Sequence, residues 1–269
     1  MDLQAMRRTA TAIAREAGEV VMQYFDSPQE MQSKQGNVFD VVTEADRASE
    51  QVIVTKLHAA FPDHRIIGEE GSSVGAADAD YFWYVDPLDG TINFTHQIPI
   101  FSVSLALADK EMRPLLGVVF NPAYNRMFSA AQGFGATLDD KPIHVSRTAV
   151  LNECVLGTGF PYDKATNPDN NLREFAALSV RTRGLRRFGS AALDLCYVAM
   201  GRFDGYWEKR IKPWDGLAGM IVVEEAGGMV TDFSGAQSKL LYMGFEVLAS
   251  NGRIHKQVLG VLQEVINQA

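Results

Sequence analysis

An apolar run from Tyr81 to Val85 leads directly into two aspartates, and this segment constrains the fold of the chain more than any other. The run predicts a buried strand, because consecutive aromatic and β-branched residues fit the interior of a sheet. Asp86 and Asp89 stand where that strand ends, followed by Gly90 and Thr91. Carboxylate oxygens suit Mg²⁺, Mn²⁺ or Ca²⁺, and backbone N–H groups beside such an ion suit a phosphate. The alternative is an ordinary Asp-Gly turn that closes the strand.

Further acidic residues lie at two other predicted element ends. Glu69 and Glu70 follow a short strand at 65–68, and Asp215 follows Pro213 in the first turn of a predicted helix. A solvated loop end would explain the glutamates, and helix capping would explain Asp215. Because functional residues collect at element ends, we expect these acidic side chains to meet in one cleft.

Several motifs together carry a family resemblance that covers about residues 5 to 265. They are the segments 40–46, 68–70, 83–94, 214–219 and 225–228. In this order and spacing they resemble the inositol monophosphatase family of metal-dependent, lithium-sensitive phosphomonoesterases. Ile92 departs from the pattern, where a threonine is common, and we expect little effect on the chemistry. The resemblance implies a mixed α+β fold, a layered α-β-α-β-α sandwich with the site between its two halves.

The resemblance also implies a ligand set for two to three Mg²⁺ ions, which Mn²⁺ could replace. Asp86 would bridge two ions about 4 Å apart. Glu69 and the Leu88 carbonyl would complete the first ion, Asp89 and Asp215 the second, and a weaker third ion would lie near Glu69. Without cations the ionised carboxylates would repel one another, so the cluster predicts metal dependence.

Hydrolysis by metal-activated water needs no covalent phosphoenzyme. The Thr91 hydroxyl and Glu69 are placed to orient or deprotonate that water, and the N–H groups of Gly90 and Thr91 would hold phosphate oxygens. Taken alone, Thr91 could instead cap a short helix.

Three supporting positions have both a structural and a functional interpretation. Thr43 and Asp46 either form a capping pair for a helix over 44–60 or, as the family implies, hold the threonine and water network beside the first metal. Lys34 lies in a loop that the family uses as a mobile flap, where its ammonium would approach the third metal or the phosphate. We expect Glu70 to support the metal ligands rather than bind an ion.

Substrate specificity depends on residues of the second half. Glu208, at the end of a predicted strand, matches a position where the family places a carboxylate against substrate hydroxyls; the alternative is a surface strand end. Ser190 and Ala191 would form the neighbouring wall, and Asp215 would also face the substrate. His96 and Arg187 could border the cleft or be structural.

The expected elements alternate between helices and clusters of strands. We expect helices over 3–25, 44–60, 167–181, 191–200, 214–226 and 253–267, with Asp26, Ser27 and Pro28 ending the first. Strands are expected over 65–68, 81–86, 101–108, 115–120, 126–131, 135–138, 203–208 and 245–250, and a polar loop over 34–37. We assign residues 1–269 to one domain with two packed halves, roughly 1–150 and 151–269.

Composition indicates a soluble cytoplasmic enzyme. The 269 residues are 46% hydrophobic, and the net charge of −8 argues against a general nucleic-acid binder. Cys154 and Cys196 form no disulfide framework, as expected in a reducing compartment. We find no signal peptide and no membrane span, and the family favours a homodimer.

The resemblance gives Mg²⁺-dependent hydrolysis of myo-inositol monophosphates as the leading hypothesis for function. The same chemistry could act on fructose 1,6-bisphosphate, histidinol phosphate, NADP or adenosine bisphosphates. A hypothesis of another class is a regulatory protein that associates with the transcription machinery. Its candidate surface is a basic cluster, for which the favoured alternative is a solvated face near a helix end; the residues are Arg181, Arg183, Arg186 and Arg187.

Overall fold

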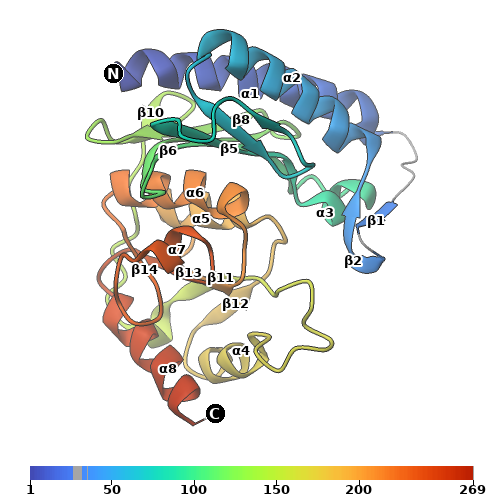
Figure 1. The fold of residues 1–269 in the computed structure, drawn as a ribbon. Coiled ribbons are helices and arrows are strands. Elements are labelled where there is room, and N and C mark those ends of the chain that lie inside the picture. The colour runs from blue at the N-terminus through green and yellow to red at the C-terminus, as the bar shows by residue number, and fades with distance from the viewer. Residues whose placement is uncertain (27–31, 35, 269) are drawn as a thin grey trace.

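Alternating layers of helices and sheets make up the fold in the computed structural model of the chain (Figure 1). The structure describes residues 1–26, 32–34 and 36–268, and of residues 37–40 the backbone only. From top to bottom in Figure 1 lie α1 and α2, a large sheet, α5 and α6, a smaller sheet, and α4 with α8. The predicted α-β-α-β-α sandwich of mixed α+β class is confirmed.

The helices of the described residues range from four to 23 residues in length. They are α1 (Leu3–Phe25), α2 (Glu44–Ala60), α3 (Thr91–Thr95), α4 (Leu172–Ser179), α5 (Ala191–Ala199), α6 (Pro213–Glu225), α7 (Lys239–Tyr242), α8 (His255–Asn267) and a 3₁₀ turn at Leu151–Glu153. None of these helices is both long and apolar enough to cross a membrane.

The large sheet has the strand order β10-β9-β8-β7-β6-β5-β3-β4 and is antiparallel except where β3 meets β5. Its strands are β3 (Arg65–Gly68), β4 (Ser73–Val74), β5 (Tyr81–Asp89), β6 (Ser102–Asp109), β7 (Pro114–Asn121), β8 (Arg126–Ala131), β9 (Ala136–Leu138) and β10 (Lys141–Pro142). The parallel pairing matters for function, because it brings the ends of β3 and β5 to the same place.

The smaller sheet has the order β12-β11-β13-β15-β14 and mixes parallel and antiparallel pairs. Its strands are β11 (Val155–Thr158), β12 (Gly184–Arg186), β13 (Gly205–Lys209), β14 (Met229–Thr231) and β15 (Glu246–Ser250). A separate hairpin, β1 (Gln32–Lys34) with β2 (Asn37–Val42), projects beside α3 on the right of Figure 1.

Helices pack on both faces of each sheet, and successive side chains of a strand alternate between the two faces. In β5, Trp83 and Val85 pack with α1 and α2, whereas Tyr84 packs with α5 and α6. Because successive side chains of a strand point to opposite faces, Asp86 continues the Tyr84 side and faces α6. A third apolar cluster joins the smaller sheet to α8 through Trp207 and Leu262, among others.

Most predicted elements are present, and their differences have local causes. The helix predicted over 167–181 is shorter, because Asn171 has a left-handed φ of 70° and its amide donates to Thr158 and Gly159. Lys34 and Asn37, expected in a polar loop, are instead register partners in the β1–β2 hairpin. The expected roles of Ser27, Pro28 and Gln35 fall outside the described residues.

Candidate active site

Three carboxylates from distant segments meet at the edge of the large sheet. Oxygens of Glu69, Asp86 and Asp215 all lie within 4.8 Å of one another. Glu69 and Asp86 come together because Gly68 and Val85 are paired in register in parallel strands, and each acid follows one member of that pair. The Glu69 N–H also donates to the Val85 carbonyl at 3.0 Å. The cluster predicted from motifs 17 residues and more apart is therefore present for these three positions.

Asp215 reaches the cluster because the start of α6 is tied to the sheet. The Ser104 hydroxyl donates to the Trp214 carbonyl at 2.9 Å, and Ser104 is the register partner of Asp86 across β6 and β5. Asp215 lies in the first turn of α6 and accepts the Lys212 N–H at 2.8 Å. It is thus both the cap expected for this helix and a member of the acidic cluster.

Asp89 occupies a different position, at the end of β5 against the N-terminus of α5. Its carboxylate accepts the Ser190 hydroxyl at 2.5 Å and the N–H groups of Ala191 and Ala192 at 3.3 and 2.9 Å. Ser190 also caps α5 by accepting the Leu193 N–H. The metal role of Asp89 and the substrate roles of Ser190 and Ala191 stay predictions, since these groups bind one another here.

Thr43, Asp46 and Thr91 form one hydrogen-bonded chain. Asp46 accepts the N–H and hydroxyl of Thr43 at 2.8 and 2.6 Å through one carboxylate oxygen. Its other oxygen lies 3.1 Å from the Thr91 hydroxyl, which also lies 3.1 Å from the Leu88 carbonyl. Capping and the contact to Thr91 were alternatives in the sequence, and both occur.

A buried residue of α2 anchors the loop that follows β3. Glu50 is buried and accepts the N–H groups of Glu70 and Ser72 at 2.9 and 3.1 Å. Gly68 leaves room for it, because a Cβ there would lie 2.4 Å from a Glu50 carboxylate oxygen. The same loop is contacted from β1, where the Lys34 ammonium lies 2.8 Å from Glu69 and 2.7 Å from Glu70. Lys34 therefore pairs with the two acids of this loop, and its approach to a third metal ion or to the phosphate stays a prediction.

Electrostatics of the cluster favour bound cations. Burial, and then the charge of Glu69, raises the pKa of both Asp86 and Asp215 well above the usual range. Burial also raises the pKa of Asp89 to about 6 and that of Glu70 to about 7. An all-oxygen donor set whose charges repel when unpaired fits a divalent cation such as Mg²⁺.

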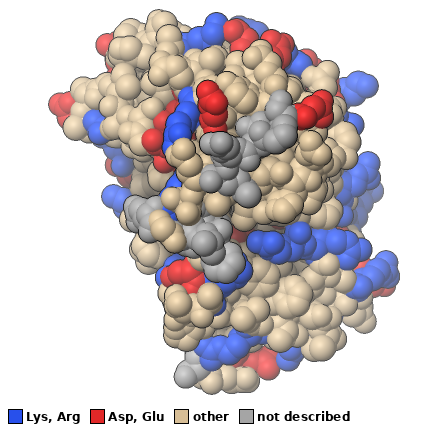
Figure 2. Space-filling view, turned by 90° about the vertical axis from the view of Figure 1, so that its right-hand side faces the viewer, with Lys and Arg blue, Asp and Glu red and all other residues tan. Residues whose placement is uncertain are grey.

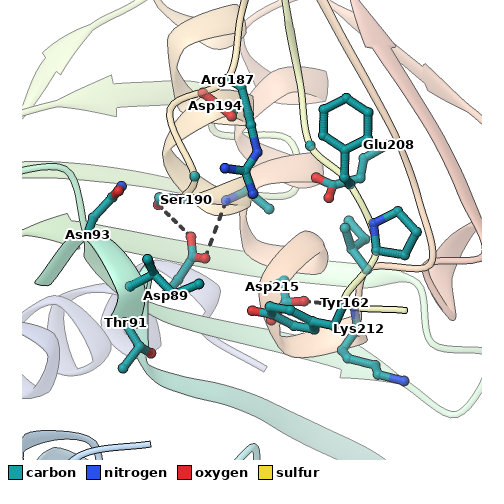
Figure 3. A pocket seen from close by; sticks show the side chains of 18 of the residues that line it. Asp89, Thr91, Asn93, Tyr162, Arg187, Ser190, Asp194, Glu208, Lys212 and Asp215 are labelled. Carbon is teal, nitrogen blue, oxygen red and sulfur yellow. Dashed lines mark hydrogen bonds between the residues drawn. The ribbon is translucent and has the colours of Figure 1, made fainter. Parts of the chain in front are cut away.

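A pocket of about 110 Å³ opens beside this cluster and draws on both halves of the chain (Figure 3). One end carries Asp89, Gly90, Thr91 and Asp215. The other end is made by residues of the second half, namely Gly159, Phe160, Arg187, Asp194 and Glu208. Gly90 has a left-handed φ of 96°, and a Cβ there would lie 3.0 Å from the Ile100 carbonyl oxygen, so only glycine fits this turn.

Glu208 lies inside the pocket wall rather than at a surface strand end. It is buried in β13 and accepts a hydrogen bond from the Tyr206 hydroxyl. Burial raises its pKa to about 7. The position favours the substrate-facing interpretation of Glu208, whereas His96 is exposed at the end of α3 and does not line the pocket.

Sequence reasoning missed the residues whose side chains hydrogen-bond the backbone next to the site. The Ser49 hydroxyl donates to the Pro87 carbonyl at 3.0 Å, one turn of α2 from Asp46 and next to Glu50. Asn93 donates to the carbonyls of Ile100 and Phe188. The available signal was the spacing of three polar residues, 46, 49 and 50, which places them on one face of a helix.

Comparison with known proteins gives consistent matches over the whole chain. A profile described as Inositol monophosphatase family matches residues 2–267. An inositol-1-monophosphatase from Synechocystis is 44% identical over 257 residues, covering 96% of this chain and 88% of the relative. A Nus factor SuhB from Pseudomonas aeruginosa is 42% identical over 265 residues, 97% of each chain. The solved inositol monophosphatase from Anabaena aligns with a TM-score of 0.88 at 43% identity, covering 98% and 97%.

Proposed function

The chain belongs to the inositol monophosphatase family and is a phosphatase, and from that premise we propose that it hydrolyses myo-inositol monophosphates with the help of Mg²⁺. The observation that carries the metal dependence is the convergence of Glu69, Asp86 and Asp215 within 4.8 Å. The observation that supports a polyol is the buried carboxylate of Glu208 at the opposite end of the adjoining pocket.

The proposed metal site is completed by two groups next to the cluster. Glu69, Asp86 and the Leu88 carbonyl would hold one Mg²⁺, and Asp86, Asp89 and Asp215 a second, with a third near Glu69. Such cations supply Lewis acidity that activates water near neutral pH and neutralises phosphate charge. Mn²⁺ has similar ligand preferences and should substitute.

The protein's own groups position the reactants. Asp46 holds the Thr91 hydroxyl at 3.1 Å, so that Thr91 and Glu69 can orient a water against the phosphorus. Gly90 and Thr91 line the same pocket, and their backbone N–H groups would bind phosphate oxygens. Glu208 would accept hydrogen bonds from hydroxyls of the departing alcohol, which a carboxylate with two oxygens can do for a diol.

A phosphate-release assay with a panel of esters tests the proposal. The panel contains inositol 1-phosphate, fructose 1,6-bisphosphate, histidinol phosphate, NADP and adenosine bisphosphate, each with Mg²⁺ and with chelator. We expect the highest kcat/KM for inositol 1-phosphate and loss of turnover with chelator. A higher kcat/KM for another ester would reassign the substrate, and unchanged activity with chelator would end the metal assignment.

A second candidate function is suggested by relatives named Nus factor SuhB, one of them 42% identical to this chain. The distribution of charge on the surface gives this second function little support. Basic and acidic side chains are interspersed on the face that carries the β1–β2 hairpin, with one band of basic side chains near mid-height (Figure 2). Of the basic cluster named above, Arg181 pairs with Glu264. Co-purification of RNA polymerase at physiological salt would favour this role.

Three finer properties accompany the proposal. We expect inhibition by Li⁺ in the millimolar range or below, a homodimer in solution, and a cytoplasmic location. The family supports the first two, and two buried free cysteines, Cys154 and Cys196, support the third. Sedimentation of the purified protein would test the dimer.

A further inference from the structure

The Arg187 side chain stands in the pocket with its donors unused. Its guanidinium lines the end that also carries Glu208, and Figure 3 shows it extending toward the pocket between Ser190 and Glu208. Within the described residues no acceptor takes a hydrogen bond from it and no carboxylate forms an ion pair with it. A guanidinium presents five N–H donors in a fixed plane, so donors that the protein leaves free are available to a ligand.

One ring contact orients this guanidinium, which belongs to an exposed residue. It lies over the ring of Phe160, 5.9 Å from the centroid, and Phe160 in turn contacts the ring of Phe175 in α4 at 5.7 Å. The backbone that follows is held by Asn93, which donates to the Phe188 carbonyl at 2.6 Å. The ring contact and the anchored backbone reduce the conformational entropy that the side chain would lose when a ligand binds.

Two buried carboxylates share this end of the pocket with the guanidinium. Glu208 and Asp194 are both buried, and Oδ1 of Asp194 has no hydrogen-bond partner within the described part of the chain. Gly159 allows Glu208 to approach the wall, because a Cβ at Gly159 would lie 2.2 Å from both carboxylate oxygens. The leaving-group end thus offers a fixed donor and a fixed acceptor, which match a hydroxyl's ability to accept as well as to donate.

We propose that Arg187 is a specificity-determining residue that binds the polyol leaving group, donating to the oxygen of one hydroxyl while Glu208 accepts from another. This inference rests on the proposed function, since it assumes a polyol phosphate. Alcohols with a single hydroxyl cannot satisfy both groups at once and gain less from this end of the pocket. A buried polar group left unpaired by such a ligand carries a desolvation penalty, which sharpens the discrimination.

The test uses Arg187→Ala, with Arg187→Lys as a conservative variant and Arg186→Ala as the matched control. Arg186 is the preceding residue, is exposed, bonds the carbonyl of Leu185 and does not line the pocket. Steady-state kinetics are measured with inositol 1-phosphate, phenyl phosphate and fructose 1,6-bisphosphate. Product inhibition is measured with free inositol, which reports the leaving-group end, and with inorganic phosphate, which reports the metal end.

For Arg187→Ala we expect KM for inositol 1-phosphate and Ki for inositol to rise about 10- to 100-fold, the loss typical of charge-assisted hydrogen bonds, with kcat changed much less. The rise in KM for phenyl phosphate should be at least fivefold smaller, and the Ki of inorganic phosphate should change less than threefold. The Arg187→Lys variant should recover part of the lost affinity for inositol 1-phosphate. Equal losses for all esters, or a loss confined to kcat, would overturn the proposal. So would a larger effect on fructose 1,6-bisphosphate, which would identify a subsite for a second phosphate.

Failure of the proposed function is distinguishable from failure of this inference. Wild-type protein that does not hydrolyse inositol 1-phosphate contradicts the proposed function. Wild-type activity on that ester combined with an Arg187→Ala variant that behaves like Arg186→Ala contradicts only the role of Arg187.

Discussion

Replacing Asp86 by asparagine should stabilise the metal-free protein while ending its catalysis. Asp86 is buried beside Glu69 and Asp215, and without cations these charges repel. Asparagine keeps the shape of the side chain, and its amide oxygen can still accept the Leu88 N–H that Asp86 accepts at 2.9 Å. The substitution therefore removes a charge at little cost in packing, yet it also removes the central proposed ligand of both cations.

The magnitude follows from the separation of the charges. Two ionised carboxylates no more than 4.8 Å apart repel by at least about 3.5 kcal/mol at an effective dielectric constant of about 20. Proton uptake relieves part of this, so we expect Asp86→Asn to raise the free energy of unfolding by about 1–3 kcal/mol at pH 7 in chelator. Burial and the charge of Glu69 raise the pKa of Asp86 in the folded state. The destabilisation that the substitution removes is therefore absent below the unfolded pKa and grows as the pH rises through the folded pKa.

Urea unfolding at pH 4 and pH 7, in chelator and in Mg²⁺, measures these differences. In chelator the variant should be more stable than wild type at pH 7 and nearly equal at pH 4. Saturating Mg²⁺ should reverse the order, because a ligand at 100 times its Kd stabilises the protein that binds it by about 2.7 kcal/mol. Asp204→Asn is the control, since Asp204 is buried but accepts hydrogen bonds from Ser146 and Val155 at 2.6 and 2.8 Å and should lose stability under all conditions. An Asp86→Asn variant less stable than wild type in chelator at pH 7 would refute the reasoning.

Three further perturbations test the support around the site and the core. Gly68→Ala should lower kcat/KM at least 10-fold, because the added Cβ would displace Glu50. Gly260→Ala is the control: this glycine has open space around it in α8, so alanine should raise the free energy of unfolding by up to about 1 kcal/mol in denaturant titrations. Lys34→Ala should lower the Kd for Mn²⁺ severalfold in calorimetry without substrate, because the Lys34 ammonium competes with the metal ion for Glu69. A Kd higher than that of the wild type would contradict this competition. Burial lowers the pKa of His255 to about 4, so the stability that comes from keeping it neutral is present above pH 6.5 and lost as the pH falls toward 4. His255→Gln should therefore flatten the acid limb of the pH–stability curve by about 2–3 kcal/mol, and an unchanged limb would exclude that origin.

The sequence predicted the elements whose signals are local. The bounds of α1 and α2 follow from helical apolar spacing and, for α2, from the Thr43 and Asp46 capping pair, and they agree with the predicted ranges of 3–25 and roughly 44–60. The acidic positions could be placed near element ends for the same reason, because the apolar run that leads into Asp86 is visible in the chain itself, although the strand continues to Asp89. What brought these ends together, the parallel register of Gly68 with Val85, is a tertiary property.

The parts that escaped prediction depend on distant contacts. Glu50 on a helix normally faces solvent, and only the folded structure shows it buried under the loop of Glu69. In the β1–β2 hairpin, β1 has three residues, and β2 lacks the apolar–polar alternation that identifies a strand. Strands β4, β10, β11, β12 and β14 and helix α7 escaped for a related reason, since each has four or fewer residues.

Crystals soaked with Mn²⁺ and phosphate would test the central claim most directly, through the anomalous signal of the manganese. The account predicts peaks at bonding distance from carboxylate oxygens of Glu69, Asp86 and Asp215, with phosphate in the adjoining pocket. Peaks found only elsewhere, in protein that is active in the same buffer, would contradict it.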